Sequence, residues 1–358
     1  MASENFIMPM QWVGPIALKY DKDQRLEYVD VPLTTYETPL WPSIKRGAKI
    51  TNMISGVQAV IVKDTMTRSI IMSSNSAHHL MTIYSELKND NKIYEIANNT
   101  SNFLKLEFWN SKILGKNIYL RFSFNTNEAS GHNMCTKASD AIINYLEQKY
   151  QLSYSSISGN YCVDKKVSAI NSIIGRGKEV IVEGTIPADI CKKYLRTTPE
   201  ALHNLNIQKN YLGSIISGSL CSANAHYANI LLAIYLATGQ DAANIVEGSQ
   251  GITTTELVNQ NLSRSLYFSV NITNIIVGVV GNGKDFKHIK NNLQRLKCLN
   301  TDSEEDLNFL YTKSQRLAMI IGAAIWCGEL SLLAAQSNPG ELMKSHLFYE
   351  RANKKQYV

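Results

Sequence analysis

The segment from Ser158 to Lys166 combines charged side chains with apolar ones. Its sequence, SGNYCVDKK, places Asp164, Lys165 and Lys166 directly after Tyr161-Cys162-Val163. A solvated charge cluster is the simplest interpretation, but the preceding apolar residues favour a partly buried loop in which a lysine needs a defined partner. An ammonium group in such a loop can stabilise an oxygen anion that develops during a reaction. This segment is therefore a candidate catalytic loop.

Three further residues are candidates for proton transfer. Glu37 lies in YETPLWP, and an apolar environment favours the protonated form of a carboxyl group near neutral pH. An exposed glutamate beside aromatic residues is an equally good interpretation of that pattern alone. Taken singly, Asp241 is a turn residue after an apolar segment, and His346 is an exposed histidine in a basic C-terminal tail.

Two glycine-rich turns, Gly175–Lys178 and Gly281–Lys284, look like fragments of a phosphate-binding loop. Neither has the GxxxxGK[ST] spacing that lets consecutive backbone amides surround a phosphate. Each turn by itself is therefore interpreted as a plain turn. The adjacent His78 and His79 cannot bring both rings to one metal ion, because neighbouring side chains diverge in a strand or helix. No metal site is predicted.

Periodic patterns predict the elements that must position these residues. Residues 117–124 alternate apolar and polar side chains, as in a half-buried strand, and a turn leads into an amphipathic helix that includes Ala138, Ile142 and Leu146. Residues 178–186 and 266–272 are also predicted strands.

Two apolar segments predict helices of a large core. Residues 224–238 are apolar on nearly every face and precede Gly239, which is typical of a buried central helix. Residues 316–336 predict a second long apolar helix. Helices and strands that do not alternate regularly indicate an α+β architecture.

The composition limits the class of protein. The chain has 358 residues, 44% of them hydrophobic and 18% charged, which is typical of a folded chain long enough for two domains. A formal net charge of +6 permits either nucleic acid or a ligand with phosphates and carboxylates. Six cysteines without a CxxC pair indicate free thiols. Without a secretory leader or an uncharged run of about 20 residues, a cytoplasmic protein with no membrane span is expected.

Read in chain order, these segments resemble the 3-hydroxy-3-methylglutaryl-coenzyme A (HMG-CoA) reductase family over almost the whole chain. The segments that carry the resemblance are ENFIMPMQWVGPI at 4–16, Glu37 followed by SIKRGAK to Lys49, RFSFNTNEASGHNM at 121–134, SGNYCVDKKVSAINSIIGRGK at 158–178, NAHYANILLAIYLATGQDAANIVEGSQGIT at 224–253 and KSH at 344–346. The DKK and GRGK run, GQDAA and the terminal KSH are similar to the biosynthetic, eukaryote- and archaea-like class.

The resemblance implies a two-domain α+β fold. A large HMG-CoA-binding domain would comprise residues 1–68 and 158–358, with the central buried helix and a catalytic loop at 158–168. A small ferredoxin-like NAD(P)-binding domain, residues 69–157, would be inserted into it, and residues 340–358 would form a mobile C-terminal flap. Since active sites of the family form between subunits, a homodimer or larger homo-oligomer is expected.

The resemblance also implies an activity: two successive hydride transfers from NADPH that convert HMG-CoA to mevalonate and CoA in the mevalonate pathway. It assigns Lys165 to stabilise the oxyanion and Glu37 to protonate the carbonyl oxygen. Asp241 would link and tune this pair, and His346 would protonate the departing CoA thiolate. Lys165 and Glu37 are therefore expected to converge on one carbonyl oxygen in a shared cleft.

Three groups of binding residues follow from the same resemblance. Contacts with the hydroxymethylglutaryl part are expected from Arg68, Ser158, Lys166, Lys209 and Asn229, and contacts with the CoA phosphates from Lys45, Arg46 and Lys49. Cofactor contacts are expected from Glu128, Ala129, Ser130, Gly131, His132, Asn133, Met134, Gly281 and Arg351. A carboxylate and a polyphosphate explain the basic excess better than nucleic acid does.

The predicted cofactor loop departs from the family pattern. Residues 128–134 are EASGHNM, where most members carry DAMGMNM. Gly131 and Asn133 are kept, so a pyrophosphate can approach the start of the following helix. Where the family offers a basic residue near the 2′-phosphate of NADPH, this chain has Asn102. Lys105 or Arg351 could take its place. NADH therefore stays open as an alternative to NADPH. A catalytically impaired CoA-binding relative and the reverse, mevalonate-oxidising activity also stay open.

Overall fold

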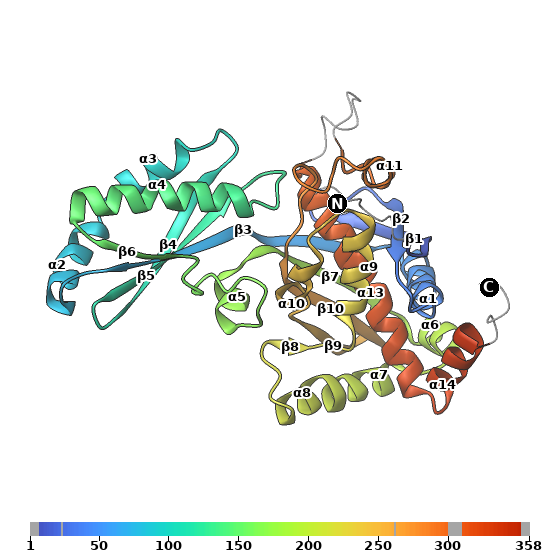
Figure 1. Cartoon of the computed structure of the whole chain (residues 1–358). Coiled ribbons are helices and arrows are strands. Elements are labelled where there is room, and N and C mark those ends of the chain that lie inside the picture. The colour runs from blue at the N-terminus through green and yellow to red at the C-terminus, as the bar shows by residue number, and fades with distance from the viewer. Residues whose placement is uncertain (1–6, 23, 261–262, 300–309, 352–358) are drawn as a thin grey trace.

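The computed structural model describes residues 7–22, 24–260, 263–299 and 310–351. It contains two hydrophobic cores. The smaller core is formed by residues between Met66 and Leu152, with Ile276 added, and the larger core by residues on both sides of this segment. Strand β3 (Val57–Ser73) runs through both (Figure 1). We name residues 66–157 the small unit and the rest the large unit.

The large unit is built on a mixed sheet with the strand order β2-β1-β3-β7-β10-β9-β8. β1 pairs in parallel with β3, and β8 with β9, while the other neighbours are antiparallel. The predicted strands at 178–186 and 266–272 are confirmed, and they pair with each other. The strands are β1 (Met10–Tyr20), β2 (Glu27–Thr34), β7 (Gly177–Ile186), β8 (Ser222–Ala223), β9 (Gly251–Gln260) and β10 (Ser263–Ile275).

Two apolar helices fill the larger core, as predicted. They are α9 (Tyr227–Ala237) and α13 (Lys313–Ser337). Trp326 of α13 packs edge-on against Phe268, and its Nε1 donates to the Phe268 carbonyl at 2.9 Å. By length and composition alone α13 is apolar enough to cross a membrane, but 94% of its most apolar window is buried inside the fold. The helix is therefore covered by protein.

Helix α1 (Leu40–Met53) packs tightly on α13. A Cβ atom added at Gly47 would lie 2.2 Å from the carbonyl oxygen of Cys327, so only glycine fits at this crossing. The contact fixes the helix that carries Lys45, Arg46 and Lys49. The remaining helices of the large unit are α5 (Ala169–Ile174), α6 (Ala188–Ile190), η1 (Cys191–Leu195), α7 (Pro199–Leu205), η2 (Asn206–Gly213), α8 (Ser214–Ile216), η3 (Ala242–Asn244), α10 (Ile245–Gly248), α11 (Lys287–Arg295), α14 (Glu341–His346) and η4 (Leu347–Arg351).

The small unit has an antiparallel sheet with the order β6-β3-β5-β4. Along the chain, β3 is followed by α2 (Ala77–Leu87), α3 (Lys92–Asn98), β4 (Lys105–Leu114), β5 (Asn117–Asn125), α4 (His132–Tyr150) and β6 (Ser153–Ile157). The strand predicted at 117–124 and the helix after it are confirmed, with Ala138, Ile142 and Leu146 buried.

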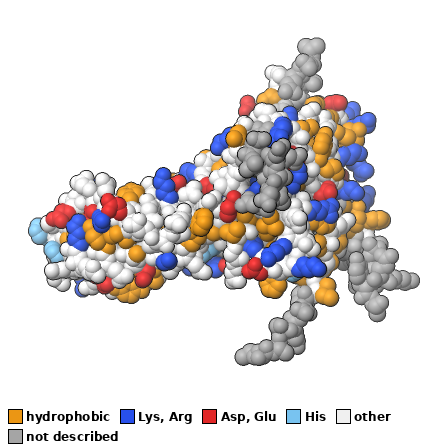
Figure 2. Space-filling model, turned by 90° about the horizontal axis from the view of Figure 1, so that it is seen from above, with side chains coloured by type: hydrophobic (Ala, Val, Ile, Leu, Met, Phe, Trp, Pro, Cys, Tyr) orange, Lys and Arg blue, Asp and Glu red, His pale blue; other side chains and the backbone are white. Residues whose placement is uncertain are grey.

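The architecture as a whole is mixed α+β, as predicted from the irregular order of helices and strands. Seen from above, the small unit is the narrow end of an elongated molecule, and most Lys and Arg side chains on this face lie over the large unit (Figure 2). The positive charge on this face therefore belongs mainly to the large unit.

Candidate active site

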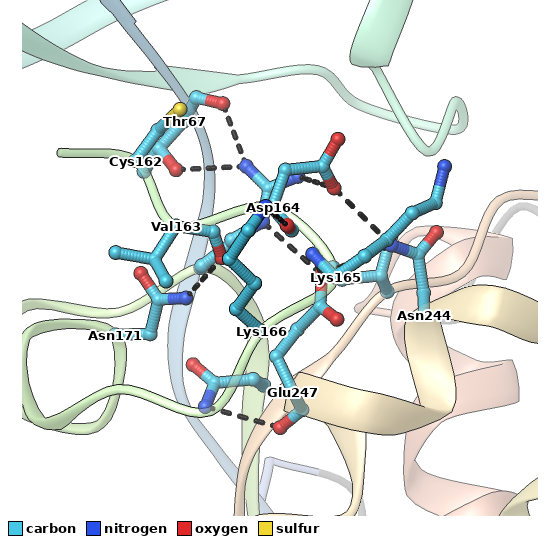
Figure 3. A network of polar contacts seen from close by, with 12 residues as sticks. Thr67, Cys162, Val163, Asp164, Lys165, Lys166, Asn171, Asn244 and Glu247 are labelled. Atoms are coloured by element: carbon cyan, nitrogen blue, oxygen red, sulfur yellow. Dashed lines mark hydrogen bonds and ion pairs between the residues drawn. The ribbon is translucent and has the colours of Figure 1, made fainter. Parts of the chain in front are cut away.

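The loop of residues 158–168 is held in place by the buried side chain of Arg176. Its guanidinium donates to Asp164 Oδ1 at 2.6 Å, to Glu247 Oε1 at 3.4 Å and to the Thr67 carbonyl at 2.8 Å. The same Glu247 oxygen accepts the backbone N–H of Lys165 at 3.1 Å (Figure 3). The turn at Gly175–Lys178, interpreted from sequence as a plain turn, thus supplies the residue that fixes the candidate catalytic loop.

Lys165 forms an ion pair with Asp241, with 2.9 Å between Nζ and Oδ2. Hydrogen bonding to Asp241 raises the pKa of Lys165, which keeps its side chain a cation. Burial is the largest single effect on Asp241 and acts to raise its pKa, but the hydrogen bonds from Lys165 and from the Ala243 N–H, together with the nearby positive charge, lower the pKa overall. The two groups therefore carry opposite charges at neutral pH.

Lys165 is less buried than the sequence suggested. Cys162 has no exposed surface, as expected for the apolar part of the loop, but the Lys165 side chain is 41% exposed. The backbone φ angles of Val163 and Lys165 are +40° and +55°, and these left-handed turns bring the lysine out of the apolar layer. The expected partly buried loop, with a lysine that has a defined partner, is therefore present, while the lysine side chain itself is exposed.

Lys165 and Asp241 line a cleft of about 790 Å³, which we name the Lys165 cleft. Its wall from the small unit is residues 129–134, and its wall from the large unit includes Gly281–Lys284. Arg68 and Asp164 also line it, and burial lowers the pKa of the lining residue Lys284 to about 8. The structure thus brings together predicted catalytic and cofactor residues that are far apart in sequence.

Residues 129–134 form the turn that begins helix α4. Gly131 has a φ angle of +85°, and a Cβ atom there would lie 2.4 Å from the Thr126 side chain. The first amides of a helix lack intrahelical acceptors, so this turn can bind an anion. Glu128 differs from its neighbours, because its carboxylate accepts the N–H groups of Lys313 and Ser314 at 2.9 and 2.8 Å and caps α13. It does not line the Lys165 cleft.

A second cleft, of about 380 Å³, is lined by Glu37, and we name it the Glu37 cleft. Arg46, Asn229 and His346 also line it, so four more predicted site residues meet there. Arg46 pairs with Glu341, the first residue of α14, and donates to the Leu195 carbonyl at 3.2 Å. Since α14 ends at His346, this ion pair holds the helix that carries the histidine.

Of four clefts in the described part of one chain, none is lined by both Glu37 and Lys165. That these two side chains converge on one carbonyl oxygen stays a prediction. The Lys165 cleft and the Glu37 cleft each contain part of the predicted catalytic set. Lys165 and Asp241 line one, while Glu37 and His346 line the other.

Other predicted residues lie around these clefts. Lys45 lines a hollow beside Trp12 and Trp41, and the Lys49 ammonium lies 4.7 Å from the centre of the Tyr194 ring. Burial lowers the pKa of Lys209, whose ammonium donates to Asn210 Oδ1 at 3.1 Å. Neither described cleft is lined by Ser158, Lys166, Lys209, Asn102 or Lys105, and the side chain of Arg351 lies outside the described part of the chain.

Sequence reasoning missed two residues of the Glu37 cleft. His226 lies one helical turn before Asn229, and this spacing within NAHYANI was the available signal. Glu341 had no local signal, because its partner Arg46 is 295 positions away in the chain. Among the described residues, no group of three His, Cys, Asp or Glu side chains could hold a metal ion.

The same architecture occurs in solved structures. A class II HMG-CoA reductase from Streptococcus pneumoniae, determined with NADPH bound, superposes with a TM-score of 0.73 at 17% identity, over 94% of this chain and 86% of that one. The α+β fold is therefore that of a known class of proteins.

This chain belongs to the hydroxymethylglutaryl-coenzyme A reductase family, whose sequence model matches residues 3–351. It is 37% identical to 3-hydroxy-3-methylglutaryl-coenzyme A reductase 2 of Dictyostelium discoideum over 96% of the chain and 64% of that protein. It is also 37% identical to the reductase of Methanocaldococcus jannaschii, over 95% of the chain and 81% of that protein. The chain spans 64% of the length of the Dictyostelium protein and 59% of the length of a further relative from Solanum tuberosum. Both shares are less than two thirds.

Proposed function

We propose that this chain is the catalytic part of an HMG-CoA reductase, which reduces HMG-CoA to mevalonate and CoA with two equivalents of NADPH. The Lys165–Asp241 ion pair carries the proposal, because it lies in the same cleft as the turn that begins α4. A fixed cation beside an anion-binding turn suits a reaction that places negative charge on an oxygen next to a phosphate-bearing cofactor. Membership of the family supports the choice of substrate.

The residues of the Lys165 cleft fit a nicotinamide dinucleotide. Gly131 lets the turn before α4 pack closely against Thr126, and no atom lies within 4 Å of a Cβ atom built at Gly281 on the opposite wall. A volume of about 790 Å³ is in the range of cofactor sites. We assign residues 129–134 and Gly281 to hold the cofactor, which supplies a hydride when bound. NADPH is the proposed cofactor, with NADH as the alternative.

Lys165 and Asp241 act on the substrate oxygen in this proposal. The ammonium group of Lys165 stabilises the alkoxide that forms when the thioester carbonyl is reduced, and it stays charged because Asp241 raises its pKa. Asp241 also fixes the position of that ammonium through the 2.9 Å contact. The arrangement lowers the energy of the charged state without a movement of the loop.

Glu37 and His346 are proposed to act from a second copy of the chain. Glu37 protonates the reduced carbonyl oxygen, and His346 protonates the departing CoA thiolate. Two clefts with half of the catalytic set each support a site completed by a partner subunit. Exposed apolar side chains beside Lys209, which include Leu212, Ile215 and Ile216 at 53%, 72% and 88% exposure, support an interface on that side of the large unit.

Two of the residues proposed for the hydroxymethylglutaryl part line these clefts. We assign Arg68, in the Lys165 cleft, and Asn229, in the Glu37 cleft, to the hydroxymethylglutaryl part. Ser158, Lys166 and Lys209 are proposed to contact it in the assembled dimer. The basic side chains of α1, at Lys45, Arg46 and Lys49, are proposed to meet the CoA phosphates.

The domain assignment is also a proposal. The order β-α-β-β-α-β with strands in the sequence β6-β3-β5-β4 supports a ferredoxin-like domain inserted at about residues 69–157. Residues 340–358 are proposed as a mobile C-terminal flap; its residues 341–349 contribute to the lining of the Glu37 cleft, and residues 352–358 lie outside the described part of the chain. All six cysteines are free thiols, which supports a reducing, cytoplasmic location.

Turnover of HMG-CoA tests the proposed function. The purified full chain is mixed with HMG-CoA and NADPH, then with NADH, and both oxidised cofactor and released CoA are measured. We expect about two cofactor molecules oxidised per CoA, as two hydride transfers require. Binding of CoA with no turnover would favour a catalytically impaired relative instead. Rates measured from mevalonate, CoA and oxidised cofactor would decide whether the reverse reaction is faster.

A further inference from the structure

We propose that His132 is a positioning residue for the cofactor: in its protonated form it pairs with Asp164 and joins the cofactor turn to the loop of Lys165. Affinity for the nicotinamide cofactor then depends on this proton. The inference rests on the proposed function, because it assumes that the Lys165 cleft binds that cofactor.

His132 lies close to Asp164 without a hydrogen bond between the two side chains. His132 is the first residue of α4, in the small unit, and its Nε2 lies 3.7 Å from Asp164 Oδ1 in the large unit. This distance is too long for a hydrogen bond but short enough for an ion pair. Nε2 is buried and has no hydrogen-bond partner in the described part of the chain. A buried nitrogen without a partner is costly, and a proton on Nε2 would give it a charge-assisted contact with the Asp164 carboxylate.

Asp164 is a fixed acceptor for this contact. Arg176 donates to the same oxygen at 2.6 Å and is itself fully buried. The contact with His132, followed by the charge of Arg176, holds the pKa of Asp164 well below its usual range, against the effect of burial. Since Asp164 stays ionised at neutral pH, the charge of this pair changes through the histidine, whose type titrates between pH 5 and 8.

The other end of the cofactor turn is held by backbone contacts. Val279 donates its N–H to the Glu128 carbonyl at 2.8 Å, and a Cβ atom at Gly278 would lie 2.3 Å from the Ser130 nitrogen. These contacts do not change with pH. His132 is therefore the place where a proton can alter how the start of α4 sits against the large unit.

The charges that face His132 fix the direction of the effect. Besides Asp164, the cleft is lined by the cations Arg68 and Lys284 and by the Lys165–Asp241 pair. A protonated His132 adds positive charge at a helix N-terminus, where a pyrophosphate is expected. Protonation therefore favours cofactor binding in two ways, by holding the turn in place and by attracting the anion.

Substitution of His132 by methionine is the matched test. His132→Met removes the ring that can hold a proton and replaces it with a flexible, uncharged side chain that adapts to its surroundings. His132→Gln is a second neutral variant that keeps polarity. Dissociation constants for NADPH are measured by its fluorescence, without acyl-CoA, from about pH 6 to about pH 7.5, where histidine titrates but Lys284 stays mainly charged.

The change of the NADPH dissociation constant with pH decides between the outcomes. We expect the dissociation constant of the wild type to rise about three- to five-fold more across this range than that of either variant, as for a partly exposed ion pair. Titration of the 2′-phosphate itself affects all three proteins equally and cancels in the comparison. Equal slopes in the three proteins would overturn the inference and leave the proposed function intact. Binding of neither NADPH nor NADH by folded wild type would overturn both.

Discussion

The Nζ atom of Lys165 lies 2.9 Å from Oδ2 of Asp241, although the two residues are 76 positions apart in the sequence. The loop that carries Lys165 is fixed by Arg176 and Glu247, while Asp241 follows the Gly239 turn at the end of α9. The pair therefore depends on the packing of two separate segments. It defines the part of the site that one chain supplies by itself.

Removal of the Lys165 ammonium is expected to abolish most of the proposed reduction. Lys165→Ala should lower kcat by about 10²–10³-fold, because the lost interaction acts mainly on the developing oxyanion. Steady-state kinetics and a separate HMG-CoA binding measurement check this. Lys112→Ala, on the exposed strand β4, is the control for loss of one positive charge. Turnover of Lys165→Ala within a few-fold of wild type would refute the assigned role.

Mixed dimers test whether the site is shared between subunits. Glu37→Gln and Lys165→Ala should each be inactive alone, but a re-equilibrated mixture should recover about a quarter of wild-type activity, since half of random dimers contain one intact site out of two. Activity is measured after mixing in mild dissociating conditions. If both residues served the same site from one chain, the mixture would stay inactive.

His346 is expected to affect the rate of a reaction only when that reaction releases a thiolate. His346→Ala should slow reduction of HMG-CoA more than reduction of added mevaldehyde, because only the thioester expels CoA. Parallel assays with the two substrates give the ratio. Glu341→Gln, which weakens the contact of α14 with Arg46, should shift the same ratio in the same direction. Equal slowing of both substrates would argue against the role of His346.

The crossing of α1 and α13 gives a stability prediction. Gly47→Ala should destabilise the protein by about 1–3 kcal/mol, because the new Cβ atom would overlap the Cys327 backbone. Gly213→Ala is the control, since its Cβ atom would meet only Gln208 O at 3.6 Å and alanine suits a helical position. Urea unfolding of both variants checks the contrast. A Gly47→Ala midpoint equal to that of the control would be inconsistent with this packing.

Asp90 gives a pH-dependent prediction in the small unit. It accepts from Tyr145, Tyr150 and Lys149 at 2.6, 2.8 and 2.9 Å, and against the effect of burial these hydrogen bonds lower its pKa to about 2. A depressed pKa stabilises the fold above the unfolded value of about 4, and this stability is lost as the pH falls toward about 2.

Asp90→Asn should therefore be less stable than wild type by about 1 kcal/mol at neutral pH. The difference should stay constant down to about pH 5 and shrink by about pH 3. Chemical unfolding at these pH values measures it, with Asp285→Asn, a 91% exposed residue, as the control. A difference that grows in acid would contradict the assigned pKa direction.

Local patterns predicted several of the helices and strands. The alternation at residues 117–124 and the uniform apolarity before Gly239 predicted a strand and a buried helix, because the side-chain period of an element is set by its own residues. The family resemblance predicted which residues to examine. Lys165, Asp241 and the turn at 129–134 then met in one cleft.

Tertiary structure alone decided which of these residues meet and how exposed they are. The apolar residues before Lys165 indicated burial, but left-handed backbone angles at Val163 and Lys165 bring the ammonium into an open cleft. Glu37 and Lys165 line different clefts because their segments pack on different parts of the large unit. A sequence period reports only on neighbours within a few residues, whereas such contacts depend on the packing of segments far apart in the chain.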